Sequence, residues 1–369
     1  MELFIQLKNF LNRQQNLDSS LGFADVLILP GYSDCLPHEV SLDSKIGGEG
    51  IPLSLPFLSA AMDTVTEFEM ARSMIKAGAI GVIHRNLSVE QIIVMVRRLR
   101  DEFKKKKVIY AAAIGVSTPK EDILKMIDAG VNFLVLDSAH GHSKNVGDKT
   151  KEIRRVAPDI FLVAGNVVTG EGARYLIDCG ASAVKVGLGS GSICTTRLVT
   201  GVGYGEFSSI KEVSKVCKER GALTIADGGL NSSEEIVKAL AAGADLVMLG
   251  YLFAGSDEAP GEVKEINGEK YKLYRGMGSR AAMESGSFDR YSKNQSDPST
   301  WVPEGVESYV KYKGSVEKII LRLKSEIQTA LGYIGAKNIQ ELQTKSKFVK
   351  ITNSVSKKSR VHTVDNVLD

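Results

Sequence analysis

The run Ala183-Val184-Lys185-Val186-Gly187-Leu188-Gly189-Ser190-Gly191-Ser192-Ile193-Cys194-Thr195-Thr196-Arg197 joins an apolar strand to a glycine-rich turn that ends on a cysteine. Closely spaced glycines let the backbone adopt positive φ angles and approach a ligand. Ser192 and the free N–H groups of such a turn can hold an anion, and nearby positive potential favours a cysteine thiolate. The pattern predicts either an anion-binding turn beside a nucleophilic Cys194 or a tight turn with a structural cysteine.

A regular alternation of short apolar runs and amphipathic segments surrounds this turn. Eight runs have the length and composition of strands, at residues 56–60, 80–84, 108–114, 133–137, 160–165, 183–187, 223–226 and 246–250. Helical patterns separate most of them, for example at residues 121–129, 144–156, 171–178, 210–219 and 233–241. Strands that are apolar on both faces and alternate with helices indicate a parallel sheet. Eight such units favour a closed (β/α)8 barrel, the TIM barrel, over an open doubly wound sheet.

Polar and glycine residues follow most of the eight runs. In a TIM barrel the carboxyl ends of the strands face the active site. Here those ends carry Met62-Asp63, His84-Arg85-Asn86, Asp137-Ser138, Gly165-Asn166, Asp227-Gly228-Gly229 and Gly250-Tyr251. Barrels often build a phosphate site from the loops after the seventh and eighth strands. We therefore expect a phosphorylated substrate above Cys194.

The chain continues for more than 100 residues beyond the eighth run. Residues 255–272 predict a hairpin that turns at Asn267-Gly268. The polar stretch at 285–304 has little periodicity, which is typical of a functional or disordered loop. We also expect a helix at 314–331, a short helix at 1–12, and a mobile tail from about 354 to 369.

The composition places limits on partners and location. The 369 residues carry a net charge of +3, so no nucleic-acid or acidic-membrane partner is implied. No apolar stretch approaches the roughly 20 residues of a membrane span. The four cysteines match no metal-binding spacing and are typical of reduced thiols, at positions Cys35, Cys179, Cys194 and Cys217. We therefore expect a cytoplasmic protein.

Several motifs, in the right order along the chain, resemble those of the IMP dehydrogenase / GMP reductase family. The matching segments are residues 23–27, 61–67, 164–169, 189–197, 226–229 and 274–279, and the similarity runs from about Gly22 to His362. The resemblance implies one TIM-barrel catalytic domain over residues 1–369, with an active-site flap at about 280–310. It also implies a homotetramer.

The same resemblance implies covalent chemistry on a purine nucleotide. Cys194 would attack C2 of the purine, with Thr196 beside it, and a nicotinamide cofactor would take the hydride; a soft thiolate suits such an electron-poor carbon. Substrate contacts would come from Met62, Asn166, Ser192, Asp227, Gly229, Gly250, Tyr251, Tyr274, Gly276, Met277, Gly278 and Glu304. Contacts to NAD would come from Asp137, Ser138 and Lys185.

Two branches of the family are in question. Arg290 and Tyr291 match the dehydrogenase flap, whose arginine helps activate water to hydrolyse the covalent intermediate, and Glu304 matches a second flap residue. Residues 201–204 and 164–171 resemble the reductase form instead. Residues 101–107 stand where dehydrogenases usually carry a pair of regulatory CBS domains. We expect NAD-dependent oxidation of IMP to XMP. The alternatives are an NADPH-dependent GMP reductase and a nucleotide-binding barrel without turnover.

The resemblance also implies a potassium site made of backbone carbonyls. Gly189, Gly191 and Cys194 match three of its ligands. The remaining ligands come from the C-terminal tail of a neighbouring subunit, where the family often has a glutamate and this chain has Lys357-Lys358-Ser359. Because an ammonium group cannot ligate a cation, we expect weak or absent activation by potassium.

Overall fold

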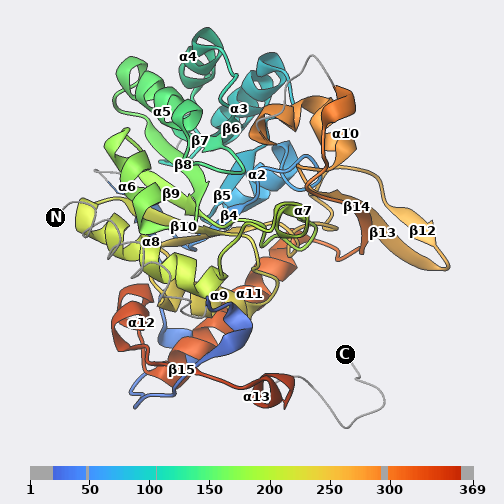
Figure 1. The fold of residues 1–369 in the computed structure, drawn as a ribbon. Helices are drawn as coiled ribbons and strands as arrows, with labels where there is room; N and C mark the ends of the chain where they lie inside the picture. Colours follow the sequence, from blue (N-terminus) through green and yellow to red (C-terminus); the bar gives the residue numbers. More distant parts are fainter. Residues whose placement is uncertain (1–19, 47–49, 105, 292–297, 359–369) are drawn as a thin grey trace.

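A closed barrel of eight parallel strands forms the centre of the molecule (Figure 1). The computed structural model describes residues 20–46, 50–104, 106–291 and 298–358. The barrel strands are β4 (Phe57–Ser59), β5 (Ile80–Ile83), β6 (Ala111–Ile114), β7 (Phe133–Asp137), β8 (Phe161–Val167), β9 (Ala183–Val186), β10 (Leu223–Asp227) and β11 (Leu246–Leu249). They pair in chain order, and β11 closes onto β4. The predicted TIM barrel is confirmed.

Helices cover the outside of the barrel. They are α2 (Phe68–Lys76), α3 (Val89–Phe103), α4 (Lys120–Ala129), α5 (Lys144–Val156), α6 (Gly170–Asp178), α8 (Glu206–Arg220), α9 (Ser233–Ala241) and α11 (Val316–Ile334). Serine and threonine side chains cap several of their amino ends, since Ser88, Thr169 and Ser232 each accept an N–H from the first turn. The helices predicted at 121–129, 144–156, 171–178, 210–219, 233–241 and 314–331 are thereby confirmed.

Both faces of the barrel strands are buried, which explains their continuous apolar character. On β7, Phe133 and Val135 belong to the core inside the barrel, whereas Leu134 and Leu136 pack against the surrounding helices. A hairpin of β2 (Ser44–Ile46) and β3 (Ile51–Leu53) adds Ile46 and Leu53 to the interior core. The sequence does not indicate these two strands, because each has only three residues and shows no readable alternation.

The strand predicted at 108–114 starts three residues later in the structure than the sequence indicated. β6 begins only at Ala111. The side chain of Asn132 accepts from the N–H of Tyr110 at 2.9 Å and donates to the carbonyl of Val108 at 3.0 Å. A side chain thus satisfies the backbone groups that a neighbouring strand would otherwise pair, and the ladder starts later.

A small sheet projects from the barrel beyond its eighth strand (Figure 1). The predicted hairpin is present as β12 (Lys264–Ile266) and β13 (Glu269–Arg275), with Asn267 and Gly268 at φ angles of 54° and 79°. A third strand, β14 (Glu307–Lys311), pairs with β13 and was not predicted. Its residues are mostly exposed, so the strand lacks an apolar alternation.

The two ends of the described chain meet. β1 (Val26–Ile28) pairs with β15 (Phe348–Lys350), and α12 (Ile339–Lys345) precedes the latter. The tail expected from residue 354 begins within a helix, α13 (Asn353–Lys358), and its remainder from 359 lies outside the described residues. The helix predicted at 1–12 also lies outside them. In the part of the chain that is described, no helix is long and apolar enough to span a membrane.

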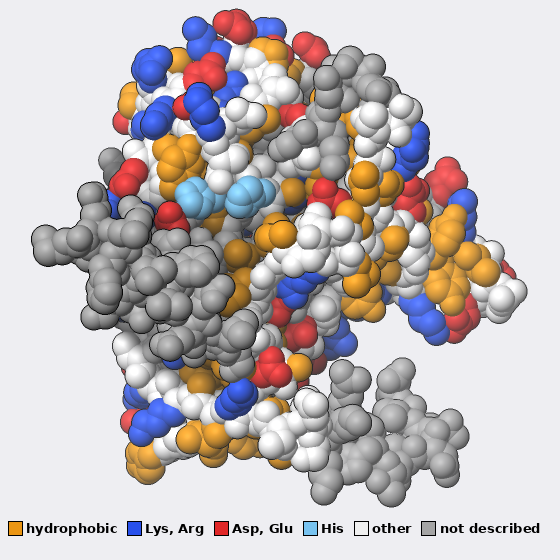
Figure 2. Space-filling model, in the orientation of Figure 1, with side chains coloured by type: hydrophobic (Ala, Val, Ile, Leu, Met, Phe, Trp, Pro, Cys, Tyr) orange, Lys and Arg blue, Asp and Glu red, His pale blue; other side chains and the backbone are white. Residues whose placement is uncertain are grey.

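Short helical turns build the segment that follows β13. They are α10 (Arg280–Ala282), η3 (Met283–Ser287), η4 (Phe288–Tyr291) and η5 (Pro298–Thr300). The sequence indicated only a polar loop here, because turns of three to five residues leave no helical periodicity. On the face shown in Figure 2, the lysine and arginine side chains of the described residues are interspersed with acidic ones and form no large basic patch.

Candidate active site

A cavity with about 780 Å³ of empty space, part of it open to solvent, lies at the carboxyl ends of the barrel strands. Barrel enzymes build their active sites at this end of the strands. Fifteen of the predicted site residues line it, namely Met62, Asp137, Asn166, Lys185, Gly189, Gly191, Cys194, Thr196, Asp227, Tyr274, Gly276, Met277, Arg290, Tyr291 and Glu304. The others are not among the lining residues; they are Ser138, Ser192, Gly229, Gly250, Tyr251 and Gly278.

Cys194 lies half-buried in the turn between β9 and the short helix α7 (Thr196–Thr200). Its Sγ is 3.2 Å from Oγ1 of Thr196, which in turn donates to Oε2 of Glu304 at 3.1 Å. A hydroxyl between a thiol and a carboxylate can accept a proton on one side and donate its own on the other. The arrangement therefore offers the Cys194 thiol a route for losing its proton.

Backbone hydrogen bonds fix Glu304 next to this cysteine. The N–H of Thr195 donates to the Glu304 carbonyl at 3.0 Å, and the N–H of Val306 donates to the Ile193 carbonyl at 3.0 Å. Cys194 and Gly305 consequently pair as a single antiparallel bridge. The segment before β14 and the cysteine turn thus form one backbone unit, although 110 positions separate Cys194 from Glu304.

Four charged side chains, of which Asp137 and Lys185 are buried, form a network across the cavity wall. Nζ of Lys185 is 2.9 Å from Oδ1 of Asp137 and 2.5 Å from Oδ2 of Asp227, and Nε of Arg290 is 2.5 Å from Oδ2 of Asp137. Burial alone would raise the pKa of Asp137, but the Arg290 and Lys185 cations outweigh it and hold that pKa at about 2. The same pairing raises the pKa of the Arg290 guanidinium above its usual value against the opposing effect of burial. Asp137 is therefore an anion, and Arg290 a cation, throughout the neutral range.

Asn166 and Asp227 meet beside this network. Nδ2 of Asn166 donates to Oδ2 of Asp227 at 2.9 Å. Oδ1 of Asn166 is buried and has no hydrogen-bond partner among the described residues. An orphaned acceptor in a cavity wall is costly unless a ligand or water donates to it. The pair therefore presents an unused acceptor at a position where a bound ligand can supply a donor.

The loops after β9, β10 and β11 converge on Tyr274 of β13. Burial raises the pKa of the Tyr274 hydroxyl to about 12, so it stays protonated and can donate. A Cβ atom at Gly250 would lie 3.0 Å from that hydroxyl, and one at Gly228 would lie 2.4 Å from Oγ of Ser190. These short distances show that the glycine loops expected to hold a phosphate pack closely against one another.

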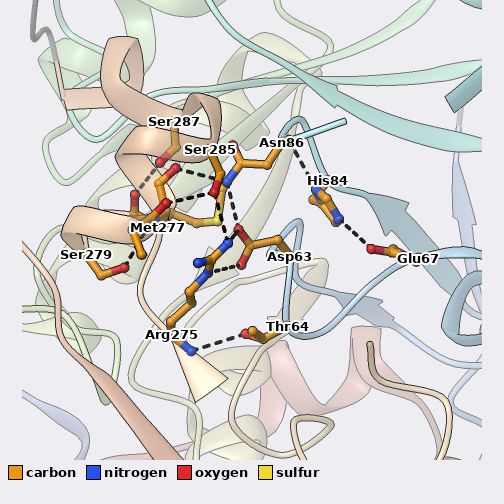
Figure 3. Close-up of polar contacts among 12 residues, drawn as sticks. Asp63, Thr64, Glu67, His84, Asn86, Arg275, Met277, Ser279, Ser285 and Ser287 are labelled. Carbon is orange, nitrogen blue, oxygen red and sulfur yellow. Dashed lines mark hydrogen bonds and ion pairs between the residues drawn. The ribbon is translucent and has the colours of Figure 1, made fainter. Parts of the chain in front are cut away.

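Sequence reasoning missed a polar cluster under the turns α10 and η3 (Figure 3). Arg275 binds Asp63 through two nitrogens, at 2.7 and 3.1 Å. Nδ2 of Asn86 donates to the same carboxylate at 2.8 Å and to the carbonyl of Ala282 at 3.2 Å. Asp63 and Asn86 stand at strand ends, which is the signal that marked them, but nothing in the sequence identified their partners about 200 positions away.

The chain matches one family along most of its length. A family model described as the IMP dehydrogenase / GMP reductase domain matches residues 20–362. The chain belongs to this family. As a member of the IMP dehydrogenase / GMP reductase family it is an oxidoreductase, and no three His, Cys, Asp or Glu side chains cluster as metal ligands within its described ranges.

Curated relatives agree with this family assignment. The chain is 40% identical to a protein of Cryptosporidium parvum, with 96% of this chain and 97% of the relative covered. It is 40% identical to a protein of Borreliella burgdorferi, with coverage of 94% and 98%, and 34% identical to one of Staphylococcus saprophyticus, with coverage of 94% and 96%. All three relatives are named inosine-5'-monophosphate dehydrogenase.

The lengths of these alignments differ. The alignment with the Staphylococcus protein spans 469 positions, 100 more than the 369 residues of this chain, so at least that many positions face gaps here. The alignment with the Cryptosporidium protein spans only 392 positions. In the structure α3 ends at Phe103 and β6 begins at Ala111, which leaves no room for a folded domain between them.

Proposed function

We propose that this chain is an NAD-dependent IMP dehydrogenase, which oxidises IMP to XMP. The observation that carries the proposal is Arg290, which reaches into the cavity of Cys194 and pairs with Asp137. A dehydrogenase must bring water to its covalent intermediate, whereas a reductase releases ammonia, so a cation held there favours the dehydrogenase. The names of the relatives support the same assignment.

The proposed reaction has two steps. The Cys194 thiolate adds to C2 of IMP, and the hydride on C2 leaves, so that a thioimidate joins the enzyme to the purine. NAD, when bound, supplies the acceptor for this hydride. Water then adds to C2 and the carbon–sulfur bond breaks, which releases XMP and restores Cys194. The balance is IMP, NAD⁺ and water giving XMP, NADH and a proton.

The residues in the cavity have distinct tasks in this scheme. Thr196 and Glu304 take the thiol proton, and the Arg290 cation stabilises negative charge as water attacks. Tyr274 donates its hydroxyl to the phosphate together with Ser192 and the glycine loops. Asp137 fits the cofactor, because a buried carboxylate can balance the positive charge of an oxidised nicotinamide ring.

A paired absorbance assay of one purified sample tests the proposal. We expect reduced nicotinamide to appear with IMP and NAD, and no consumption of it with GMP and NADPH. Consumption in the second mixture alone would instead identify a reductase, which the motif at residues 201–204 resembles. If neither mixture responds while IMP still binds, the chain is a nucleotide-binding barrel without turnover.

We further propose that potassium activates this enzyme weakly or not at all. The Gly191 carbonyl already accepts the N–H of Cys194 at 3.0 Å, and the side chain of Lys358 lies outside the described residues. The expectation therefore rests on Lys357-Lys358, which stand in the tail where the family often has a glutamate. The measurement is the steady-state rate in sodium and in potassium at equal ionic strength, and a clear increase in potassium would refute it.

Three further expectations belong to the same proposal. They are a homotetramer, a cytoplasmic location, and the absence of strong allosteric control by purine nucleotides. The last follows from the direct connection between α3 and β6, which leaves no regulatory domain in that position.

A further inference from the structure

Asp289, the residue before Arg290, is buried although the proposed chemistry does not use it. Its side chain is only 7% exposed. Oδ1 accepts from the guanidinium of Arg85, and Oδ2 accepts from both the N–H of Ser117, at 3.2 Å, and the Ser117 hydroxyl. Arg85 follows β5 and Ser117 follows β6. One carboxylate of η4 thus joins two neighbouring loops of the barrel.

Arg85 is held rigidly on the barrel side of this contact. Nη1 donates to the backbone carbonyl of Asp137 at 3.2 Å, and the side chain is 6% exposed. A Cβ atom at Gly115 would lie 2.2 Å from Nη2, so only glycine lets the guanidinium lie there. Burial lowers the pKa of Arg85 to about 10, which still leaves a cation at neutral pH. Asp289 therefore meets a fixed positive charge.

Asp289 and Arg290 are consecutive, so the position of one sets the position of the other. Arg290 donates to Asp137, and its carbonyl accepts the N–H of Ala139 at 2.9 Å. We propose that Asp289 is a positioning residue, and that the clamp Arg85–Asp289–Ser117 holds η4 so that Arg290 stays at Asp137 above Cys194. The clamp places no atom in the reaction and acts through Arg290.

The clamp has a second consequence, which rests on the proposed function. While η4 is docked, both oxygens of Asp137 are occupied, one by Lys185 and the other by Arg290. A cofactor ring that uses Asp137 must therefore compete with Arg290. Weakening the clamp favours the undocked segment, which slows hydrolysis and at the same time tightens cofactor binding. A variant that is merely destabilised would impair both.

The test compares Asp289→Asn with Glu284→Gln, a change to an exposed residue of the same segment that pairs with Arg280. For Asp289→Asn we expect an unchanged rate of the first burst of NADH, with steady-state turnover reduced about 10- to 100-fold, because small displacements of a positioned group cost this much. The dissociation constant of NADH, measured by its fluorescence without turnover, should fall. Glu284→Gln should behave as the unaltered enzyme.

A readout independent of activity separates failure of the clamp from failure of the proposed function. Trypsin can cleave after Arg290 only when η4 leaves the barrel, because that side chain is 13% exposed when docked. We expect cleavage there to be several-fold faster in Asp289→Asn, and to a smaller extent in Ser117→Ala, than in the control. Equal cleavage in all of them would overturn the clamp, whatever reaction the enzyme catalyses.

Other results also decide between the possibilities. If burst and steady state fall together and NADH binds more weakly, Asp289 has a general structural role and the proposal is wrong. Contacting residues show interaction energies, so the effects of Arg85→Gln and Asp289→Asn on turnover should not simply add in the double variant. If they do add, the pair is not coupled and the proposal is wrong. If the unaltered enzyme forms no NADH from IMP and NAD, the proposed function fails while the cleavage result still tests the clamp.

Discussion

Replacing Cys194 with serine is expected to abolish turnover while IMP continues to bind. A hydroxyl is a far weaker nucleophile than a thiolate near neutral pH, so the covalent step has no replacement. Removing a nucleophile of this kind costs at least about 1,000-fold in turnover. Binding persists because the cavity wall is otherwise unchanged, and Sγ is replaced by a smaller atom at the same position. Turnover is followed by NADH absorbance and binding by calorimetry with IMP.

Intact-protein mass measured after mixing with IMP and NAD provides the direct check. The unaltered enzyme should gain the mass of IMP less two hydrogen atoms, one lost as the hydride from C2 and one as the thiol proton, and Cys194→Ser should gain nothing. Cys217→Ser is the matched control, since burial raises the pKa of the Cys217 thiol to about 11 and leaves it protonated and slow to react. An adduct that persists in Cys194→Ser, or one that disappears in Cys217→Ser, would contradict the assignment of the nucleophile.

The barrel was predictable because its signal is local and repeated. Each buried strand reads as an apolar run, and helices end at glycines such as Gly130, Gly180 and Gly243, whose φ angles are 120°, 107° and 115°. The strands that were missed have three to five residues, and some of them pair with distant partners, as β1 does with β15. Segments this short carry no periodicity, and only tertiary contacts select their conformation.

In the candidate site too, local sequence signals were readable and long-range contacts were not. Residues at strand ends were identified because the fold places them at the cavity, and Lys185 stands out as a charge inside an apolar strand that requires partners. The partners themselves, Asp137 and Asp227, follow from geometry alone. Arg85 and Asp289 are 204 positions apart, and no spacing rule connects them. Long-range ion pairs are therefore the part of the site that sequence reasoning does not reach.

Replacing Arg290 with glutamine is expected to slow hydrolysis while leaving hydride transfer intact. Because Asp137 raises the pKa of the Arg290 guanidinium, that group is a permanent cation in the docked segment rather than one ready to accept a proton. Its contribution is then electrostatic, through stabilisation of the charge that develops on attacking water. Glutamine retains a hydrogen-bond donor but removes the charge. We expect steady-state turnover to fall about 100- to 1,000-fold, the size reported for a lost stabilising group of this type.

Rapid mixing with IMP and NAD distinguishes the two steps. Arg290→Gln should form NADH in a burst at the original rate and then accumulate the covalent nucleotide, because water no longer resolves it. Arg280→Gln is the control, since Arg280 is exposed in the same segment and pairs with Glu284. If the burst slows in proportion to turnover, Arg290 acts at or before hydride transfer, and its assignment to hydrolysis is wrong. If Arg290→Gln leaves turnover unchanged, the enzyme does not need activated water at this site, which is the behaviour expected of a reductase. The same variant therefore also tests which branch of the family the chain occupies.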